Sequence, residues 1–139
     1  MRHGEALALL VLDLQAFKEL NDACGHDEGD RALVAVADAL RRTVRAGDSV
    51  YRWGGDEFAA LLPHANAASA RVVARRIAAA VGEIVTSAGR VAVNIGVACV
   101  PDDGEAVGPL MQAADERMYA AKARRQAVVD GDAAVGGSG

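Results

Sequence analysis

The chain has 139 residues, of which 52% are apolar, and a formal net charge of −4 at pH 7. This length and composition predict one domain with enough apolar side chains for a hydrophobic core. The acidic balance argues against a general nucleic-acid-binding or anionic-membrane surface. No apolar stretch reaches the roughly 20 residues that span a bilayer, and the N-terminus makes a poor signal peptide. We therefore expect a cytoplasmic domain with no nucleic-acid partner and no direct membrane contact.

The cysteines and the C-terminal end indicate no metal site and no further fold. Cys24 and Cys99 lack metal-binding spacing, so both are expected to be reduced thiols. The chain ends in Val-Gly-Gly-Ser-Gly, which has the composition of a linker. We expect residues 1–129 to form the domain and residues 130–139 to form a Gly-rich flexible tail.

Hydrophobic periodicity predicts the secondary structure in chain order. Strands are expected at residues 6–12, 49–53, 58–62, 91–98 and 128–129, and helices at about 27–44, 67–85 and 107–124. Asp27 is expected to cap the first of these helices. The order is β-α-β-β-α-β with an extra helix and strand, which predicts an α+β sheet with helices packed mainly on one face.

The segment from Trp53 to Phe58 joins two of these strands. Gly54 and Gly55 lie between two apolar runs and predict a tight hairpin turn with positive φ. Asp56 and Glu57 follow at the start of the return strand, where acidic residues are normally depleted. Adjacent strand residues point to opposite faces, so these two carboxylates can do different jobs. A hairpin with a solvated acidic edge is the alternative reading of this segment alone.

A third carboxylate lies at the end of the first strand. Asp13 follows the apolar run directly, and the topology allows this strand to lie beside the Gly54–Gly55 hairpin. Asp13 and Asp56 together fit a Mg²⁺ site, because Mg²⁺ takes few protein ligands and completes its octahedron with water and substrate phosphates. The glycine turn and the loop at residues 15–18 can both offer backbone N–H groups to phosphate.

Several separated segments resemble the motifs of one known family in order and spacing. They are Asp13–Asp22, Gly25–Asp30, Arg45–Asp48, Arg52–Phe58, Asn94–Ala98 and Ala114–Lys122. The first resembles D-[IL]-D-x-F-K-x-x-N-D, the fifth resembles S-I-G-V-A, and the fourth carries Gly-Gly-Asp-Glu-Phe. Over about residues 6–129, the chain therefore resembles GGDEF domains, the diguanylate cyclase family.

The resemblance implies a palm-like, ferredoxin-type sheet similar to nucleotidyl cyclase catalytic domains. It implies that each domain binds one GTP with Mg²⁺ or Mn²⁺. Two domains then face each other as a homodimer and form cyclic di-GMP and two pyrophosphates. It further implies a bacterial parent protein with a sensory or dimerising domain.

The resemblance also assigns roles by position. Asp13 and Asp56 would bind the metal by their side chains and Leu14 by its carbonyl, while Glu57 would position or deprotonate the attacking hydroxyl. Asn21 and Asp30 would read the guanine edge. The residues expected to contact the rest of the substrate are Phe17, Lys18, Gly54, Gly55, Lys122 and either Arg125 or Arg124.

The resemblance implies a second site a few residues before the Gly54–Gly55 turn. Arg45 and Asp48 match the family's R-x-x-D site for inhibition by its own product, and Arg76 is expected to be their partner. Arginine suits both phosphate and the guanine Hoogsteen edge. Without the resemblance, an Arg-x-x-Asp pair is a common helix-end ion pair of little energetic worth.

Three departures from the family pattern leave alternatives open. Gln15 replaces the second acidic residue of D-x-D, although by alternation it should face away from Asp13. The segment after Lys122 lacks the usual glycine, and the family's opening D-x-L-T-G-L-x-N-R motif is not present in the chain. The main alternative to an active cyclase is an inactive module that binds cyclic di-GMP or GTP as a receptor. Other cyclic dinucleotide or adenylate chemistry is disfavoured by Asn21 and Asp30.

Overall fold

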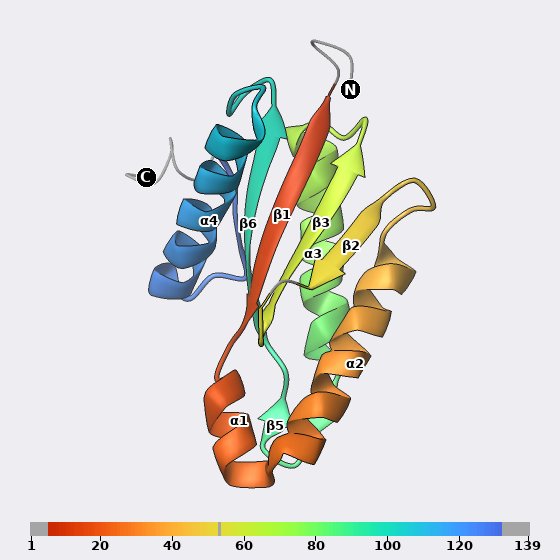
Figure 1. Ribbon diagram of the computed structural model, residues 1–139, viewed down its shortest axis with the longest axis vertical. Coiled ribbons are helices and arrows are strands. Elements are labelled where there is room, and N and C mark those ends of the chain that lie inside the picture. The colour runs from red at the N-terminus through yellow and green to blue at the C-terminus, as the bar shows by residue number, and fades with distance from the viewer. Residues whose placement is uncertain (1–5, 53, 132–139) are drawn as a thin grey trace.

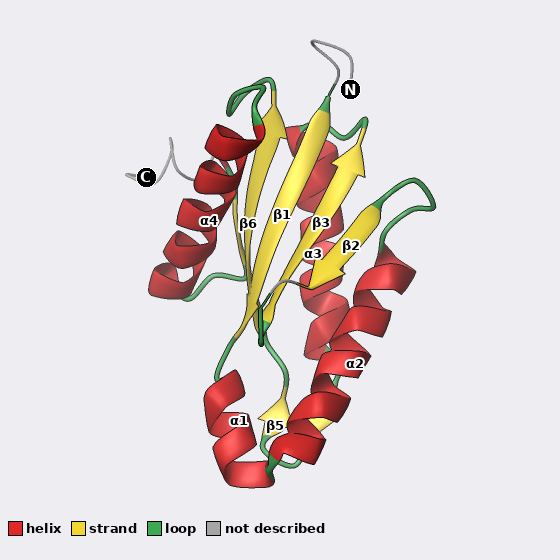
Figure 2. Ribbon diagram, in the orientation of Figure 1, coloured by secondary structure: helices red, strands yellow, loops and turns green. Residues whose placement is uncertain are grey.

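The computed structural model describes residues 6–52 and 54–131. The helices are α1 (Phe17–Cys24), α2 (His26–Thr43), α3 (Ala67–Gly82) and α4 (Val107–Arg124). The strands are β1 (Leu7–Leu14), β2 (Ser49–Arg52), β3 (Glu57–Pro63), β4 (Val85–Thr86), β5 (Gly89–Arg90), β6 (Val93–Val100) and β7 (Val128–Val129). Figures 1 and 2 show these elements arranged around one main sheet.

The main sheet has the strand order β2-β3-β1-β6-β7. Strand β1 lies near its centre and pairs antiparallel with both β3 and β6, while β7 runs parallel to β6. Five consecutive residues of β1, from Ala8 to Leu12, are buried, as the unbroken apolar run of the sequence indicates. The order of β1, β2, β3 and β6 confirms the predicted ferredoxin-type α+β sheet.

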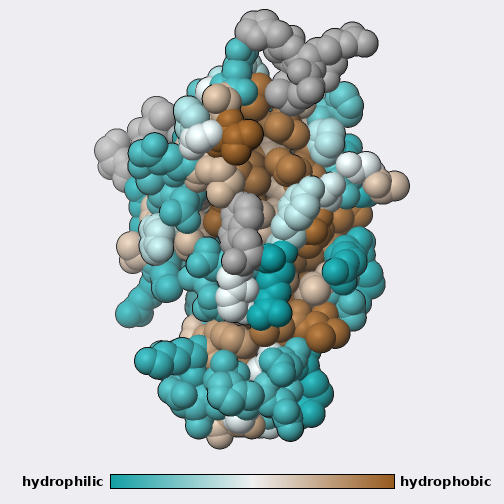
Figure 3. All heavy atoms as spheres, in the orientation of Figure 1, coloured by the Kyte–Doolittle hydropathy of each residue, from teal (hydrophilic) through white to brown (hydrophobic). Residues whose placement is uncertain are grey.

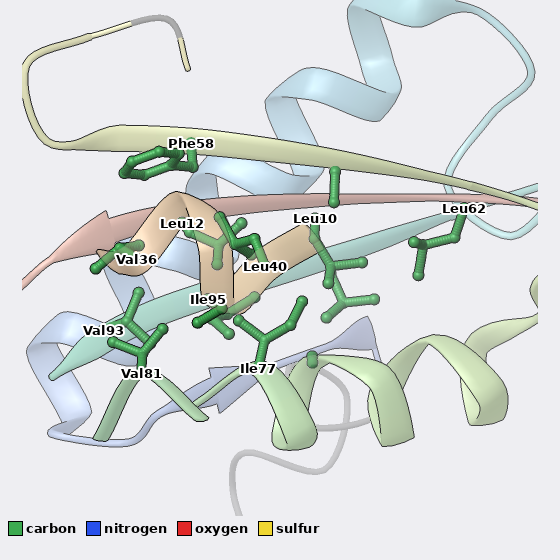
Figure 4. Close-up of a cluster of buried hydrophobic side chains, with 14 of the residues drawn as sticks. Leu10, Leu12, Val36, Leu40, Phe58, Leu62, Ile77, Val81, Val93 and Ile95 are labelled. Atoms are coloured by element: carbon green, nitrogen blue, oxygen red, sulfur yellow. The ribbon is translucent and has the colours of Figure 1, made fainter. Parts of the chain in front are cut away.

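Helices α2 and α3 cover one face of the sheet. On this face Leu10 and Leu12 of β1 meet Phe58 of β3 and Ile95 of β6, and Ile77 of α3 closes the cluster (Figure 4). Each of these side chains is almost completely removed from water. Burial of side chains of this size contributes about 1.5–3 kcal/mol each to the hydrophobic stabilisation of the fold.

Helix α4 covers the opposite face, which corrects the prediction that the helices lie mainly on one face. Leu9 and Val11 of β1 pack there against Leu110 and Met118 of α4. The alternation of side chains along β1 makes this possible, because both of its faces are apolar. Figure 3 shows hydrophobic side chains over the sheet on this side and hydrophilic ones around the end that carries α1.

Two short elements were not predicted from the sequence. Residues 15–22, expected to be a connecting segment, contain most of α1, and residues 85–90 form the β4–β5 hairpin. This hairpin is fastened to α2 because Glu28 accepts hydrogen bonds from the backbone N–H (2.7 Å) and the hydroxyl (2.8 Å) of Ser87. Helix α2 begins after Gly25, so Asp27 lies in its first turn and is not the cap.

The predicted tail begins at residue 130, and the structure describes its first two residues. Asp130 is buried, with 5% of its surface exposed, and its carboxylate lies 3.2 Å from Nε of Arg71. Residue 130 is therefore part of the folded unit, whereas residues 132–139 lie outside the described part. Across residues 6–52 and 54–131 there is no helix of the length and apolarity that crossing a membrane requires.

Gly96 of β6 allows α4 to lie directly against the sheet. A Cβ at this position would collide with the carbonyl oxygen of Ala114 and the backbone nitrogen of Met118, both in α4. We predict that Gly96→Ala lowers the free energy of unfolding by about 2–3 kcal/mol, because the helix backbone must shift. Urea denaturation measures this change.

Gly108→Ala is the matched control, since Gly108 lies in α4 and a Cβ there meets nothing within 4 Å. This control should leave stability unchanged or slightly raised. An unfolding midpoint for Gly96→Ala equal to that of the native chain would contradict the close-packing argument.

Candidate functional site

The candidate site forms where β1 ends, and there the sheet aligns three polar side chains. Asp13 of β1 is directly opposite Glu57 of β3 on one side and Asn94 of β6 on the other. Paired residues of antiparallel strands project to the same face. The backbone N–H of Leu14 donates to the carbonyl of Asp56 (3.1 Å), which holds the β2–β3 connection against the end of β1. The predicted approach of Asp13 to the Gly-Gly turn is thus confirmed.

The β2–β3 connection is longer than the predicted tight turn. Arg52 pairs with Phe58, so residues 53–57 lie between the paired positions, and Trp53 is outside the described residues. Gly55 does not have a positive φ, unlike Gly25. The predicted primed turn with positive φ at both glycines is therefore wrong, because a longer connection relieves the need for it.

Arg52 braces this connection, a role that the sequence reasoning missed. Its Nε donates to the carbonyl of Gly54 (3.1 Å) and its Nη2 to the carbonyl of Gly55 (2.8 Å). Two hydrogen bonds from one planar guanidinium fix the shape of the loop. The only signal available in the sequence was its place directly before Trp-Gly-Gly. The brace holds Asp56 and Glu57 at the end of β1.

Burial and neighbouring negative charges raise the pKa of two carboxylates of the site, Asp13 and Glu57. Burial raises the pKa of Asp13, and the charge of Asp56 raises it further, while the hydrogen bond from Lys122 partly offsets both. Burial also raises the pKa of Glu57, followed by the charges of Asp13, Asp56 and Asp115. The site thus concentrates negative charge that solvent screens poorly. Such an arrangement is unfavourable until a cation binds.

Lys122 supplies the one positive charge that directly contacts Asp13 in the described structure. It lies near the end of α4, and its Nζ is 3.2 Å from Oδ2 of Asp13. Half of the Lys122 side chain is exposed, whereas that of Asp13 is 12% exposed. Arg124 and Arg125 follow on the exposed end of the helix, with Arg125 in the left-handed conformation (φ 56°). Of the three basic residues predicted to contact phosphate from this helix end, Lys122 is therefore the one that the structure places against Asp13.

The residues present fit a hydrated divalent cation. Oδ1 of Asp13 is buried and has no hydrogen-bond partner, and Asp56 is near enough to interact electrostatically with Asp13. Within the described residues, no three His, Cys, Asp or Glu side chains are arranged to hold a metal by themselves. Two carboxylates suit Mg²⁺, which keeps several waters and takes further oxygens from phosphates.

Helix α1 begins next to this site. Ala16 links β1 to α1 with φ 55°, a left-handed conformation that costs a non-glycine residue about 1–2 kcal/mol. Phe17 and Lys18 occupy the first turn, where backbone N–H groups have no acceptor within the helix. Such groups are favourable partners for phosphate. Gln15 is exposed, and its backbone bonds to Ala92.

Asn21 and Asp30, the predicted base-reading pair, come from two different helices. Oδ1 of Asn21 is buried without a partner and lies so close to Gly29 that a Cβ there would collide with it. Gly29 therefore lets α2 approach α1, and Asp30 follows it directly. Asp30 lines a surface cavity of about 410 Å³ between α2 and β2 that also includes Leu33 and Phe58. The structure thus places Asn21 against Gly29, the residue directly before Asp30.

The predicted product site is only partly assembled. The backbone N–H of Arg45 donates to Oδ2 of Asp48 (2.8 Å), and the two side chains approach to 3.8 Å. The Arg45 side chain is 61% exposed and that of Asp48 is 2% exposed. Arg76 is exposed on α3, and none of the hydrogen bonds or ion pairs of the described residues joins it to Arg45 or Asp48. Asp48 therefore shapes the loop, and the Arg45 side chain stays largely exposed beside it.

Comparison with known proteins decides the family. A family model described as "Diguanylate cyclase, GGDEF domain" matches residues 1–127. The chain belongs to this family. As a GGDEF domain, it is 41% identical over 125 residues to the diguanylate cyclase TpbB of Pseudomonas aeruginosa, covering 86% of this chain and 29% of TpbB. It is 38% identical over 116 residues to the diguanylate cyclase DgcM of Escherichia coli, covering 83% of this chain and 28% of DgcM.

Solved structures agree with this assignment. The GGDEF domain of TpbB has a TM-score of 0.81 and 41% identity, with 88% of this chain and 79% of that chain covered. The GGDEF domain of DgcB from Caulobacter crescentus, solved in complex with cyclic di-GMP, has a TM-score of 0.84 and 29% identity, with 91% of this chain and 78% of that chain covered. The palm-like fold is thereby confirmed. This GGDEF domain spans less than a third of the length of TpbB and DgcM.

We predict that Asp13→Asn makes this GGDEF domain more stable at neutral pH in metal-free buffer. The pKa of Asp13 is raised in the fold, so folding favours its neutral form, and its negative charge costs stability once the pH rises through that raised pKa. The gain should be about 1 kcal/mol, in the usual range for relieving a functional-site charge conflict. It should disappear below the ordinary Asp pKa of about 3.9.

Differential scanning calorimetry near pH 4 and at pH 7.5, with EDTA present, measures the difference. Asp22→Asn, at an exposed position of α1, is the matched control. A lower Tm for Asp13→Asn at pH 7.5 would show that the carboxylate stabilises the metal-free fold.

Proposed function

We propose that this domain is a diguanylate cyclase that condenses two GTP molecules into cyclic di-GMP and two pyrophosphates. The observation that carries the proposal is the convergence of Asp13, Asp56 and Glu57 with Lys122 at the end of β1, in a member of the GGDEF family. The repulsion among the three carboxylates fits a reaction that needs a divalent cation. Relatives named diguanylate cyclases support the same conclusion.

Asp13 and Asp56 hold Mg²⁺ or Mn²⁺ in this proposal, together with the carbonyl of Leu14. When bound, the cation neutralises charge on the phosphate oxygens and on the leaving pyrophosphate. Lys122 pairs with Asp13 in the structure and must move from it when the metal binds. Its exposed side chain then reaches the β- and γ-phosphates, with Arg125 or Arg124 beside it.

Glu57 acts on the attacking 3′-hydroxyl group. A raised pKa makes its carboxylate a better acceptor for the hydroxyl proton at neutral pH than an ordinary glutamate. Because Glu57 is directly opposite Asp13, the hydroxyl is oriented next to the metal carboxylates. The backbone N–H groups of Gly54, Gly55, Phe17 and Lys18 bind phosphate oxygens around it.

Guanine is selected by acceptors at the α1–α2 junction. The unpaired Oδ1 of Asn21 and the carboxylate of Asp30 accept hydrogen bonds from the amino group and N1–H of guanine. Adenine lacks these donors, and buried acceptors left unpaired would cost about 1–3 kcal/mol. One domain holds one GTP in this scheme, so two domains must face each other as a homodimer for the reaction. A partner domain in the longer parent protein would bring them together in the cytoplasm.

We predict that Asp56→Ala abolishes product formation, lowering turnover at least a hundredfold because the metal loses one of its two carboxylates. The experiment uses this domain fused to a strong dimeriser, with GTP and Mg²⁺, and resolves the products by chromatography. The purified protein is first checked for co-purified cyclic di-GMP. ATP in place of GTP is the substrate control, and Asp102→Ala, at an exposed loop residue away from the site, is the variant control.

Unchanged turnover in the Asp56→Ala dimer would refute the metal assignment. No product from the native dimer, despite GTP binding and confirmed dimerisation, would instead favour the receptor module. Restoring an N-terminal segment with the family's D-x-L-T-G-L-x-N-R motif then tells whether that segment is required for chemistry.

Product binding at Arg45 and Asp48 is the second part of the proposal. The loop fixed by Asp48 presents an exposed arginine, whose guanidinium can bind the phosphate or guanine of cyclic di-GMP. Arg76 on α3 completes the site when the ligand bridges them. The cyclic di-GMP complex of the DgcB GGDEF domain is consistent with a ligand of this kind.

We predict that Arg45→Ala weakens cyclic di-GMP binding by at least tenfold, the loss expected for one charge-assisted hydrogen bond. Isothermal titration calorimetry measures the Kd. Arg42→Ala, at an exposed residue one turn earlier on α2, is the matched control and should bind normally. Equal affinity in Arg45→Ala and the native domain would remove this site from the proposal.

A further inference from the structure

Asn94 is a buried polar residue of the site to which the proposed reaction assigns no role. It lies in β6 with 1% of its surface exposed. It is directly opposite Asp13 in the β1–β6 register, as Glu57 is in the β1–β3 register. Glu57, Asp13 and Asn94 therefore form one polar row across three adjacent strands.

The amide nitrogen of Asn94 holds the segment that follows α4. Nδ2 donates to the carbonyl oxygen of Gln126 at 2.9 Å. A carbonyl only accepts, so this end of the amide must be its nitrogen. The next residue of β6, Ile95, donates its backbone N–H to the carbonyl of Ala127 at 2.7 Å. Two consecutive residues of β6 thus fix the chain directly after Arg125.

This segment ends the arm that carries the basic side chains. We use "phosphate arm" for residues 122–126, which include Lys122, Arg124 and Arg125. The N–H of Gln126 donates to the carbonyl of Ala121 (2.9 Å), the residue directly before the arm, and closes the helix end. The arm is therefore held relative to Asp13 by its attachment to β6 and by the contact between Lys122 and Asp13. Within the described residues, the exposed side chains of its two arginines make no hydrogen bond or ion pair of their own.

The other end of the Asn94 amide has no partner. Its Oδ1 is buried without a hydrogen bond, as is Oδ1 of Asp13 on the neighbouring strand. An unpaired buried acceptor costs about 1–3 kcal/mol, so this oxygen by itself lowers the stability of the fold. The unpaired oxygen of Asn94 thus belongs to the residue that holds the phosphate arm, on the strand next to the metal carboxylate Asp13.

We propose that Asn94 is a positioning residue for nucleotide binding: it ties the phosphate arm to β6 through Gln126, beside Asp13, and so places the arm's arginine against the triphosphate. The inference rests on the proposed function for the identity of the nucleotide. This role explains why the polar row of Glu57, Asp13 and Asn94 has a buried polar side chain at its β6 position. Asn94 affects nucleotide affinity only through the phosphate arm, so its effect requires the arginine of the arm that contacts phosphate.

The test measures equilibrium binding of a GTP analogue with a methylene bridge between the α- and β-phosphates, which cannot release pyrophosphate. Asn94→Leu keeps the branched shape of the side chain and removes the tether. Its Kd for the analogue with Mg²⁺ should rise about tenfold, the size of one misplaced charged hydrogen bond. Its Tm should stay close to that of the native domain, because an apolar isostere also removes the unpaired oxygen. Val97→Ala, a buried β6 control away from the arm, should lower the Tm and leave the Kd unchanged.

A double-mutant cycle then separates positioning from general damage. Arg124→Ala and Arg125→Ala are made alone and together with Asn94→Leu. In the background that lacks the phosphate-binding arginine, Asn94→Leu should have little further effect on the Kd, because coupled residues are not additive. Asn94→Ser, which restores a short hydrogen-bonding group, should recover part of the affinity.

Two results would overturn the inference. One is a Kd for Asn94→Leu within twofold of the native value, and the other is full additivity with both arginine variants. The Kd values are measured without turnover, so they test the inference even when the native domain forms no cyclic di-GMP. In that case the cyclase proposal fails while the positioning role is still decided by the Kd values.

Discussion

The antiparallel pairing of β1 between β3 and β6 is the constraint on which the rest of the structure depends. This register places Glu57 and Asn94 on either side of Asp13 and leaves no freedom to separate them, since a one-residue slip would turn the side chains to the other face. The same strand is apolar on both faces, so it anchors the helices on each side of the sheet. The core and the site are thus fixed by one set of backbone hydrogen bonds.

This geometry concentrates charge where the fold would be more stable without it. Asp13 and Glu57 both have raised pKa values because they are partly buried beside other carboxylates. Lys122 reduces the repulsion at Asp13 through an exposed and adjustable side chain. The left-handed Ala16 adds backbone strain at the same end of the sheet. Stability is lower here than an apolar strand end would give, and the same features favour binding of a cation with phosphates.

Much of the chain was predictable because the deciding signals are local. The helix at residues 107–124 and the strand at 128–129 have the predicted bounds, since apolar periodicity alone defines them. Helix α1 was missed because it has only eight residues, half of them polar, and contact with α2 supports it. The placement of α4 on the second face could not be read from its own sequence. It depends on Gly96, whose missing side chain admits the helix backbone.

The site residues could be predicted from the sequence, because spaced motifs preserve residue identity and order. Asp13, Asp56, Glu57 and Lys122 were named on that basis, and the fold brings them together. Only the tertiary structure decided that Asn94 lies beside Asp13 and holds the chain after α4. Strand register and the docking of the helix end are set by contacts between residues far apart in the chain, so no local pattern encodes them.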